Sequence, residues 1–297
     1  MAESRLDRLV RGQRWLDGVA DLVQRLVGKT YEALGGPGRV LKSVMHGTFV
    51  LGHPLHPALT DVPLGAWAAG VALDYAAHFT ARVPEAAGDV ALAVGLLAAA
   101  AAMLTGYTDF HETYGQERRL ALVHGLVMTA AALLEALSLA LRWWAGPGGH
   151  PAAVAISTVA FATAAVGMFV GGHLTFGMGT AVNRNAFQEG PQDYVEVGPA
   201  SRFSEGELVR VEAGGLPVVV VRSPNGLMAL GAVCSHAGGP LDEGTLEGDV
   251  VTCPWHGSRF CMRDGRVLGG PATFPQPLLD VRERDGGVEV KLARPLH

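Results

Sequence analysis

Two short stretches in the last quarter of the chain, CSHAGG at residues 234–239 and CPWHGS at residues 253–258, are the most informative part of the sequence. Each offers one thiol and one imidazole as candidate metal ligands, and together they supply Cys234, His236, Cys253 and His256. Sixteen residues, 237–252, separate the two pairs. Because thiolates and imidazoles both bind soft or borderline metals, the pattern predicts two loops that hold a metal centre between them.

Two kinds of centre use two cysteines and two histidines. A zinc site is the structural alternative, but zinc fingers usually pair Cys with Cys and His with His at their own short spacings. The pairing of one Cys with one His in each loop favours a [2Fe-2S] cluster, in which two cysteines bind one iron and two histidines bind the other. Histidine ligation raises the reduction potential above that of an all-cysteine cluster, and such a cluster transfers one electron.

The C-terminal region, residues 193–292, resembles the Rieske ferredoxin family. Besides the two loops, the resemblance rests on Arg259-Phe260 through Gly265 and on GPA at residues 270–272. It implies an all-β domain whose inner iron takes the two cysteines and whose outer, solvent-facing iron takes the two histidines. Electrons are then expected to enter and leave through the imidazoles.

Four other positions near the loops refine this resemblance. Rieske proteins of bc-type complexes carry two further loop cysteines joined as a disulfide, whereas this chain has Ala237 and Trp255 in that neighbourhood. The lack of these two cysteines implies a Rieske protein of the ferredoxin type. Ser258 is a candidate hydrogen-bond donor that tunes the cluster potential, or only a turn residue. Cys261 is expected to pack as a small buried hydrophobe.

Short β-type runs support a compact β domain over residues 193–297, preceded by a linker at residues 186–192 that contains Gly190-Pro191. Gly, Pro and Asn-Gly turns separate these runs. The runs are Glu207–Val211, Val218–Arg222, Leu278–Arg282 and Val288–Leu292.

The middle of the chain is strongly apolar, in line with a hydrophobic content of 49% and a mean hydropathy of +0.25. Its four long runs each approach the roughly 20 residues that cross a bilayer as a helix. They are Ala58–Ala77, Gly88–Gly106, Leu120–Trp144 and Ala152–Gly172, with a turn at 146–149 between the last two. The runs lack a periodic polar face, and Trp143-Trp144 suits a membrane interface. We therefore expect a four-helix transmembrane bundle over residues 46–185 rather than a soluble bundle.

This apolar region also carries a family resemblance. The segment from His53-Pro54 through Asp61, with Asp74 and the GGHL stretch at residues 171–174, resembles a bacterial four-helix membrane family of unknown function over about residues 45–185. The resemblance implies the helical fold but lends no activity.

The N-terminal segment, residues 1–45, is predicted to form an amphipathic helix over 5–27 that ends before the GGPG stretch at 35–38. Its basic face suits anionic lipid, and packing against the chain's own domains is the alternative. The segment is rich in Arg, Asp and Glu and contains no apolar core of a signal peptide.

The distribution of basic residues predicts the orientation in the membrane. Eight lie in the N-terminal segment, Arg118 and Arg119 lie in the second connection, and Arg184 follows the last run. The other two connections have only Arg82 and Arg142. The positive-inside rule then places both termini and the cluster domain in the cytoplasm.

Five histidines fall near the predicted cytoplasmic ends of the apolar runs: His53, His56, His111, His124 and His173. His124 and Glu135 are eleven residues apart, so they share one helix face, which we expect to point into the bundle. Neutral imidazoles on facing helices suit a b-type haem or a metal ion, and a quinone is a third candidate. Histidines that only sit in the headgroup zone are the alternative.

These features predict a membrane-anchored electron-transfer protein, or a component of an oxidoreductase, with a soluble electron donor or acceptor. No independent catalytic site is identified in the sequence, which leaves open whether the protein is an enzyme. An oxygenase would need a mononuclear iron module after the cluster, where only residues 292–297 follow. The alternative is a redox sensor, or a ferredoxin component of an oxygenase or reductase system, whose helices are only an anchor. The net charge of -5 and pI near 6.1 argue against nucleic acid. Three cysteines argue against a disulfide framework.

Overall fold

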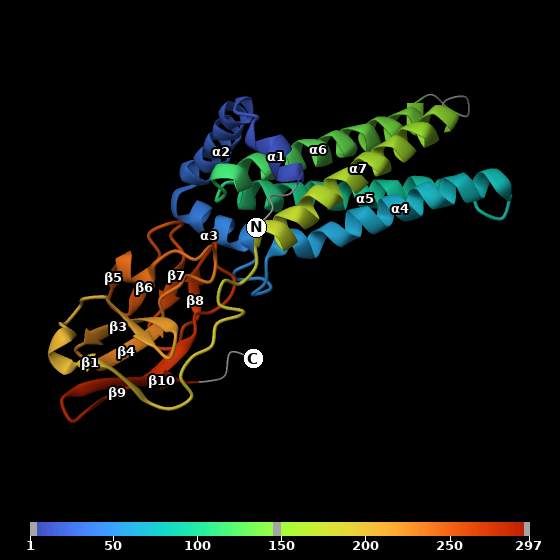
Figure 1. Cartoon of the computed structure of the whole chain (residues 1–297). Coiled ribbons are helices and arrows are strands. Elements are labelled where there is room, and N and C mark those ends of the chain that lie inside the picture. Colours follow the sequence, from blue (N-terminus) through green and yellow to red (C-terminus); the bar gives the residue numbers. More distant parts are fainter. Residues whose placement is uncertain (1–4, 145–149, 294–297) are drawn as a thin grey trace. The chain divides into compact units, whose positions relative to one another are not determined.

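The computed structural model describes residues 5–144 and 150–293, and the predicted turn at 146–149 lies outside them. The chain forms two compact units (Figure 1). The helical unit contains residues 1–38 and 55–180, and the β unit contains residues 39–54 and 181–297. The predicted order, a helical region followed by a β-rich domain, is thus confirmed. The segment 39–54, which precedes the long helices, groups with the β unit.

Four long helices form the body of the helical unit: α4 (Leu55–Phe79), α5 (Glu85–Phe110), α6 (Gly115–Trp144) and α7 (His150–Met178). Helix α4 packs along α5 and α6 along α7, and the α5–α6 and α4–α7 contacts close the bundle. Glycines let α4 and α5 approach closely, because a Cβ on Gly70 would lie 2.5 Å from Leu92 Cδ2. Small residues at helix contacts are typical of membrane bundles.

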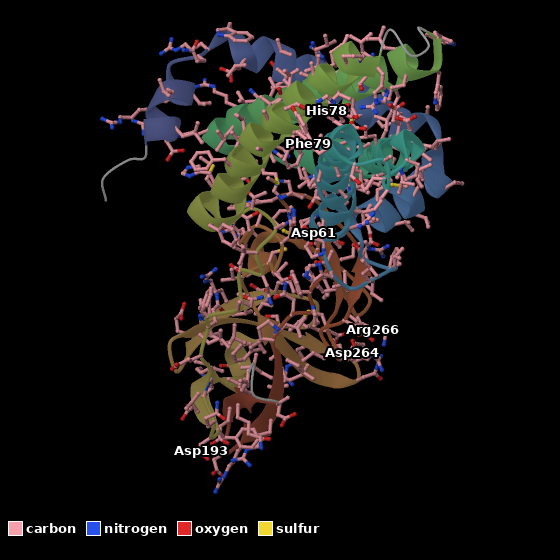
Figure 2. The ribbon with its side chains drawn as sticks, turned by 90° about the vertical axis from the view of Figure 1, so that its right-hand side faces the viewer. Asp61, His78, Phe79, Asp193, Asp264 and Arg266 are labelled. Carbon is pink, nitrogen blue, oxygen red and sulfur yellow. The ribbon has the colours of Figure 1, made fainter. Side chains whose placement is uncertain are left out.

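Among the described residues, three helices are long and apolar enough to cross a membrane, namely α5, α6 and α7. The sequence predicted four. Helix α4 has the length, with 25 residues, but it carries Asp61 and Asp74 and an internal Pro63. Figure 2 marks Asp61 near the start of α4, and His78 and Phe79 at its end.

Three shorter helices precede the bundle: α1 (Arg5–Arg11), α2 (Trp15–Ala33) and α3 (Gly35–His46). The single helix predicted over 5–27 is therefore two, separated near Gly12. The GGPG stretch opens α3 instead of only ending a helix, since Pro37 lies in its first turn, where a missing N–H costs nothing.

Helix α2 packs against the bundle with its apolar face. Leu16 and Ala20 are buried in one cluster with Leu120 and Leu122 of α6. Salt bridges flank this contact, with Asp17 on Arg119 at 2.6 Å and Asp21 on Arg118 at 2.6 Å. Of the two predicted roles for this segment, packing against the chain's own helices is the one that the structure shows.

The β unit holds two antiparallel sheets, ordered β1-β10-β9-β4-β3-β2 and β5-β6-β7-β8. The first sheet contains β1 (Val195–Pro199), β2 (Val209–Ala213), β3 (Leu216–Ser223), β4 (Gly226–Gly231), β9 (Leu278–Arg284) and β10 (Gly287–Leu292). The second contains β5 (Thr245–Glu247), β6 (Val250–Thr252), β7 (Arg259–Cys261) and β8 (Val267–Gly269). All four predicted β-type runs overlap strands of the first sheet.

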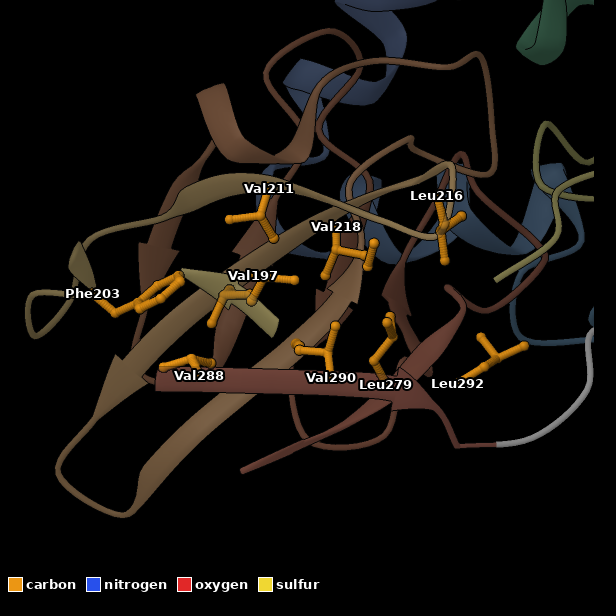
Figure 3. Close-up of a cluster of buried hydrophobic side chains, with 12 residues drawn as sticks. Val197, Phe203, Val211, Leu216, Val218, Leu279, Val288, Val290 and Leu292 are labelled. Carbon is orange, nitrogen blue, oxygen red and sulfur yellow. The ribbon is translucent and has the colours of Figure 1, made fainter. Parts of the chain in front are cut away.

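Strand β3 is buried on both faces and separates two cores. Val218 and Val220 join the cluster drawn in Figure 3, with Phe203 and Val290. Val219 and Val221 point the other way, as alternate residues of a strand must, into a second core that includes Cys234 and Cys253. The cysteines that begin the two candidate ligand loops therefore lie in a hydrophobic core.

The predicted linker at 186–192 also packs on the β unit. Its Pro191 carbonyl accepts a hydrogen bond from the Leu292 N–H at 2.8 Å. Just before it, the Arg184 N–H donates to the Ser235 carbonyl at 3.1 Å, and Asn185 is buried. The approach to the first strand is thus an ordered part of the unit.

Candidate metal centre

Two loops of the same design carry the predicted ligands. Loop A (residues 234–239) follows β4, and loop B (residues 253–258) connects β6 to β7. In each loop the cysteine N–H donates to the carbonyl five residues later, at 2.8 Å in both cases. The N–H four residues later donates back to the cysteine carbonyl, from Gly238 at 2.9 Å and from Gly257 at 3.1 Å. Both glycines have a positive φ, which this turn requires.

The loops bring the two thiols together. Cys234 and Cys253 are 1% and 3% exposed, and their sulfur atoms form a hydrogen bond with each other. This bond lowers the pKa of Cys253 to about 6, with help from the backbone N–H groups of Trp255 and His256. The same bond and burial raise the pKa of Cys234. A thiolate is the form that binds a metal.

The two imidazoles also meet. The rings of His236 and His256 have centroids 5.0 Å apart and are nearly perpendicular, at 87°. Both residues are partly exposed, in contrast to the cysteines. The neighbouring Trp255 is 49% exposed, with its ring centroid 6.4 Å from that of His256. The site thus has a buried sulfur side and a nitrogen side that reaches the surface.

A glycine permits the close approach of the two loops. A Cβ on Gly239 of loop A would lie 2.8 Å from the Cys253 sulfur and 3.0 Å from Cγ of Trp255. Both distances are shorter than ordinary van der Waals contact. The glycine at this position therefore keeps space around the paired sulfur atoms.

A third loop, residues 270–272, closes over loop B. The Ala272 N–H donates to the Ser258 hydroxyl oxygen at 3.0 Å, and Ser258 is completely buried. Since the Ser258 oxygen accepts this bond, its own proton remains to be donated. The bond from Ala272 fixes the Ser258 side chain within loop B. Its role in tuning the reduction potential of the cluster remains a prediction. Cys261 is buried, as expected.

The segment 39–54 holds this third loop in place. The Ser43 hydroxyl accepts a hydrogen bond from the Gly270 N–H at 3.1 Å. The Thr48 hydroxyl donates to the Ala272 carbonyl at 2.9 Å. The His53 ring lies edge-on to Phe274, with centroids 5.9 Å apart. No motif in the sequence pointed to Ser43 or Thr48, because their partners lie more than 200 positions away.

The donor set fits a [2Fe-2S] cluster. Two buried sulfurs in contact and two adjacent imidazoles provide two protein ligands for each iron, which is the Rieske arrangement. Within residues 5–144 and 150–293, no group of three or more His, Cys, Asp or Glu side chains is placed to hold one metal ion. When bound, the cluster supplies one-electron chemistry.

The five membrane-region histidines have different neighbours. His53 belongs to the β unit. His111 contacts Glu112 at 3.0 Å and His173 contacts Asp7 at 3.0 Å. Only His56 and His124 lie together, with ring centroids 6.1 Å apart, and each Nδ1 donates to a backbone carbonyl, of Ala102 and Gly167 respectively. A shared haem or metal site for all five gains no support from this arrangement.

Comparison with known proteins agrees with the geometry. Residues 193–281 match the Rieske [2Fe-2S] domain, and residues 52–184 match a family described as Predicted membrane protein (DUF2231). Ferredoxin CarAc of Metapseudomonas resinovorans is 35% identical over 100 residues, which cover 33% of this chain and 94% of the relative. The ferredoxin component of biphenyl 2,3-dioxygenase of Rhodococcus jostii (strain RHA1) is 41% identical over 73 residues, covering 25% and 68%.

A solved structure is similar as well. One chain of the complex of reduced oxygenase and oxidised ferredoxin in carbazole 1,9a-dioxygenase shares 35% identity, covering 34% of this chain and 94% of that chain, with a TM-score of 0.32. On the family match and the curated relatives, the chain belongs to the Rieske [2Fe-2S] family through residues 193–281, which follow a DUF2231 membrane-protein domain at residues 52–184.

Proposed function

We propose that this chain is a membrane-anchored Rieske ferredoxin that passes single electrons to or from a soluble redox partner. In this proposal Cys234 and Cys253 bind the inner iron, and His236 and His256 bind the outer iron. The observation that carries it is the pair of matched loops, which place two buried sulfurs in contact and two partly exposed imidazoles side by side. The exposed imidazole side, next to Trp255, is then the route of the electron.

The partner is proposed from the relatives. Ferredoxin CarAc and the ferredoxin component of biphenyl 2,3-dioxygenase match this chain over 94% and 68% of their own length. The second of these is by its name a component of an oxygenase system. We therefore expect an oxygenase or a reductase as the soluble partner of this chain.

Anchoring in the bilayer is supported by the outer surface of the helices. Large apolar side chains are exposed along α5, α6 and α7, for example Leu97 at 76%, Leu133 at 67% and Phe169 at 71%. Such a surface is too apolar for contact with water alone. Trp143 and Trp144 at the end of α6 suit the interface with the headgroups. The basic residues favour a cytoplasmic position for the β unit.

The helical unit acts as an anchor in this proposal, and electrons exchange through the β unit. A redox sensor with the same cluster is the second possibility that the sequence left open. The two differ in turnover: a carrier must be reduced and reoxidised repeatedly by its partners, whereas a sensor need only respond once.

The test uses the full chain in detergent, with photoreduced flavin as electron donor and cytochrome c as acceptor. The proposal predicts that the chain raises the rate of cytochrome c reduction above the rate with reduced flavin alone, and that this increase disappears in His256→Ala. Cys261→Ala is the matched control, because Cys261 is a buried thiol outside the proposed ligand set. A His256→Ala variant that keeps full activity contradicts the proposed electron route.

Anchoring is tested separately on membranes from cells that express the chain. The proposal predicts that the chain stays in the membrane after alkaline carbonate extraction. Protease added to inside-out vesicles should release the β unit, whereas protease added to right-side-out vesicles should not. The reverse pattern contradicts the cytoplasmic orientation.

A further inference from the structure

A charged network lies buried inside the helical unit. The Arg142 guanidinium of α6 makes a two-pronged contact with Asp74 of α4, with N–O distances of 2.9 and 2.6 Å. It also donates to Asp89 of α5 at 2.7 Å. The Arg142 and Asp74 side chains are 1% and 0% exposed, whereas Asp89 is 28% exposed. One cation is therefore shared by two carboxylates, and one of them reaches the surface.

A third carboxyl group joins this network two helical turns earlier on α6. Glu135 is completely buried. Its Oε1 accepts a hydrogen bond from the Ser157 hydroxyl of α7 at 3.1 Å. Its Oε2 is buried and accepts no hydrogen bond from any side chain or backbone group within the described part of the chain. If Glu135 were ionised, the negative charge on Oε2 would be buried without a hydrogen-bond donor to stabilise it.

The balance of charge argues that Glu135 carries a proton. Asp74 already neutralises Arg142, and Asp89 adds a second negative charge to the same guanidinium. An ionised Glu135 would add a further negative charge beside buried Ala131, Ala132 and Leu139. Burial of an unpaired carboxylate in apolar surroundings is so costly that such a group takes up a proton instead.

A hydrogen-bonded path leads from Glu135 towards the surface. The Ser157 oxygen lies 2.6 Å from the Ser138 oxygen and accepts a bond from Arg142 Nη2 at 3.2 Å. Arg142 in turn contacts Asp89, the partly exposed member of the network. The path ends in the Arg142 guanidinium, which has no acceptor atom and cannot pass a proton on, so Arg142 separates the buried acid from Asp89 and the medium.

We propose that Glu135 is a proton-binding site of the helical unit and that Arg142, held by Asp74 and Asp89, closes this site from the medium. Release of the proton breaks the carboxyl O–H bond, leaves the electron pair on Glu135 and transfers the proton to water. Binding reverses this, and no electron moves. The site is independent of the iron–sulfur loops, and the groups that face it are Asp74, Asp89 and Arg142.

Infrared spectroscopy of the full chain in lipid nanodiscs tests the site. A protonated carboxyl group has a carbonyl stretch that carboxylates lack, and this band moves to lower frequency in heavy water. The proposal predicts such a band at neutral pH and its loss in Glu135→Gln. Glu85→Gln, at the exposed start of α5, is the matched control and should keep the band. A folded Glu135→Gln chain that keeps the whole band overturns the proposal.

Two further variants keep the test decisive if Glu135→Gln fails to fold. Ser157→Ala removes the hydrogen bond to Oε1, so the carbonyl band should move to higher frequency, and an unmoved band overturns the assignment to Glu135. Asp89→Asn removes one of the two carboxylates that hold Arg142, so it should leave the band in place but speed its shift after transfer to heavy water by several fold. An unchanged rate of exchange overturns the closure of the site by Arg142 and Asp89.

Discussion

The Thr48 hydroxyl donates a hydrogen bond to the carbonyl of Ala272 at 2.9 Å, although 224 positions separate the two residues in the sequence. Ala272 lies in the loop whose N–H holds Ser258 of loop B. The stretch between α2 and α4 therefore supports the loop beside the proposed cluster. In this chain the Rieske unit includes residues that precede the helical bundle.

Thr48→Val should destabilise the β unit. The substitution keeps the size of a buried side chain but removes the donor to the Ala272 carbonyl, and leaving a buried acceptor without its partner costs about 1–3 kcal/mol. Urea unfolding, followed by the visible circular dichroism of the cluster, measures the change. Thr245→Val, on an exposed position of β5, is the control. Equal midpoints for Thr48→Val and the unmodified chain would show that this contact is unimportant.

Ser258→Ala should lower the reduction potential of the cluster. The Ser258 oxygen accepts the Ala272 N–H, so the hydroxyl proton is left to point elsewhere in a completely buried place. A hydrogen bond donated towards the cluster stabilises the added negative charge of the reduced form. Protein-film voltammetry provides the comparison, with the exposed Ser204→Ala as the control. A potential unchanged in both variants would make Ser258 a turn residue only.

Gly239→Ala should reduce the amount of bound cluster. The new methyl group would lie 2.8 Å from the Cys253 sulfur, so loops A and B must move apart. Iron and acid-labile sulfide per chain give the measure. The control is Gly269→Ala, whose Cβ would find its nearest neighbour, Arg259 Cδ, at an ordinary 3.5 Å. Full cluster content in Gly239→Ala would contradict the close packing of the loops.

The two loops that the sequence singled out are built from local contacts. Each loop needs only one Cys, one His and nearby glycines, and its hydrogen bonds close within six residues. The strands were predictable for the same reason, since alternation along β3 directs Val218 and Val219 to opposite cores. Long apolar runs likewise marked the bundle helices.

The sequence was less informative wherever partners come from different elements. Helical spacing placed His124 and Glu135 on one face, and both do point into the bundle. Spacing does not show which residue stands opposite, so the pairing of Asp74 with Arg142 was missed. It also leaves open the partner of each histidine, such as Asp7, which His173 contacts at 3.0 Å. The docking of Thr48 depends on a contact that no local pattern encodes.

Acid should loosen helix α2 from the helical unit. The Arg119 guanidinium, by its hydrogen bonds to Asp17, lowers the pKa of that carboxyl below its usual value. A carboxyl group with a lowered pKa in the folded state stabilises the fold above its unfolded pKa of about 3.9. This contribution is lost as the pH falls through the lower, folded pKa.

Hydrogen exchange of residues 15–33 in the full chain provides the measurement. Protection of α2 should fall on acidification in the unmodified chain. Asp17→Asn should show weaker protection already at neutral pH and a smaller change with acid. Glu32→Gln, at an exposed position of the same helix, is the control. Identical pH profiles for Asp17→Asn and the unmodified chain would contradict the role of this ion pair.

Pulsed electron paramagnetic resonance of the reduced full chain, grown with isotopically labelled histidine, examines the proposed ligand set itself. If His236 and His256 bind the outer iron, the spectrum must show hyperfine coupling to two imidazole nitrogens. His78→Ala, which alters an exposed histidine at the end of α4, should leave both couplings intact, and His256→Ala should abolish the signal. A reduced cluster without coupled histidine nitrogen, or an unchanged spectrum in His256→Ala, would contradict the Rieske assignment of these four residues.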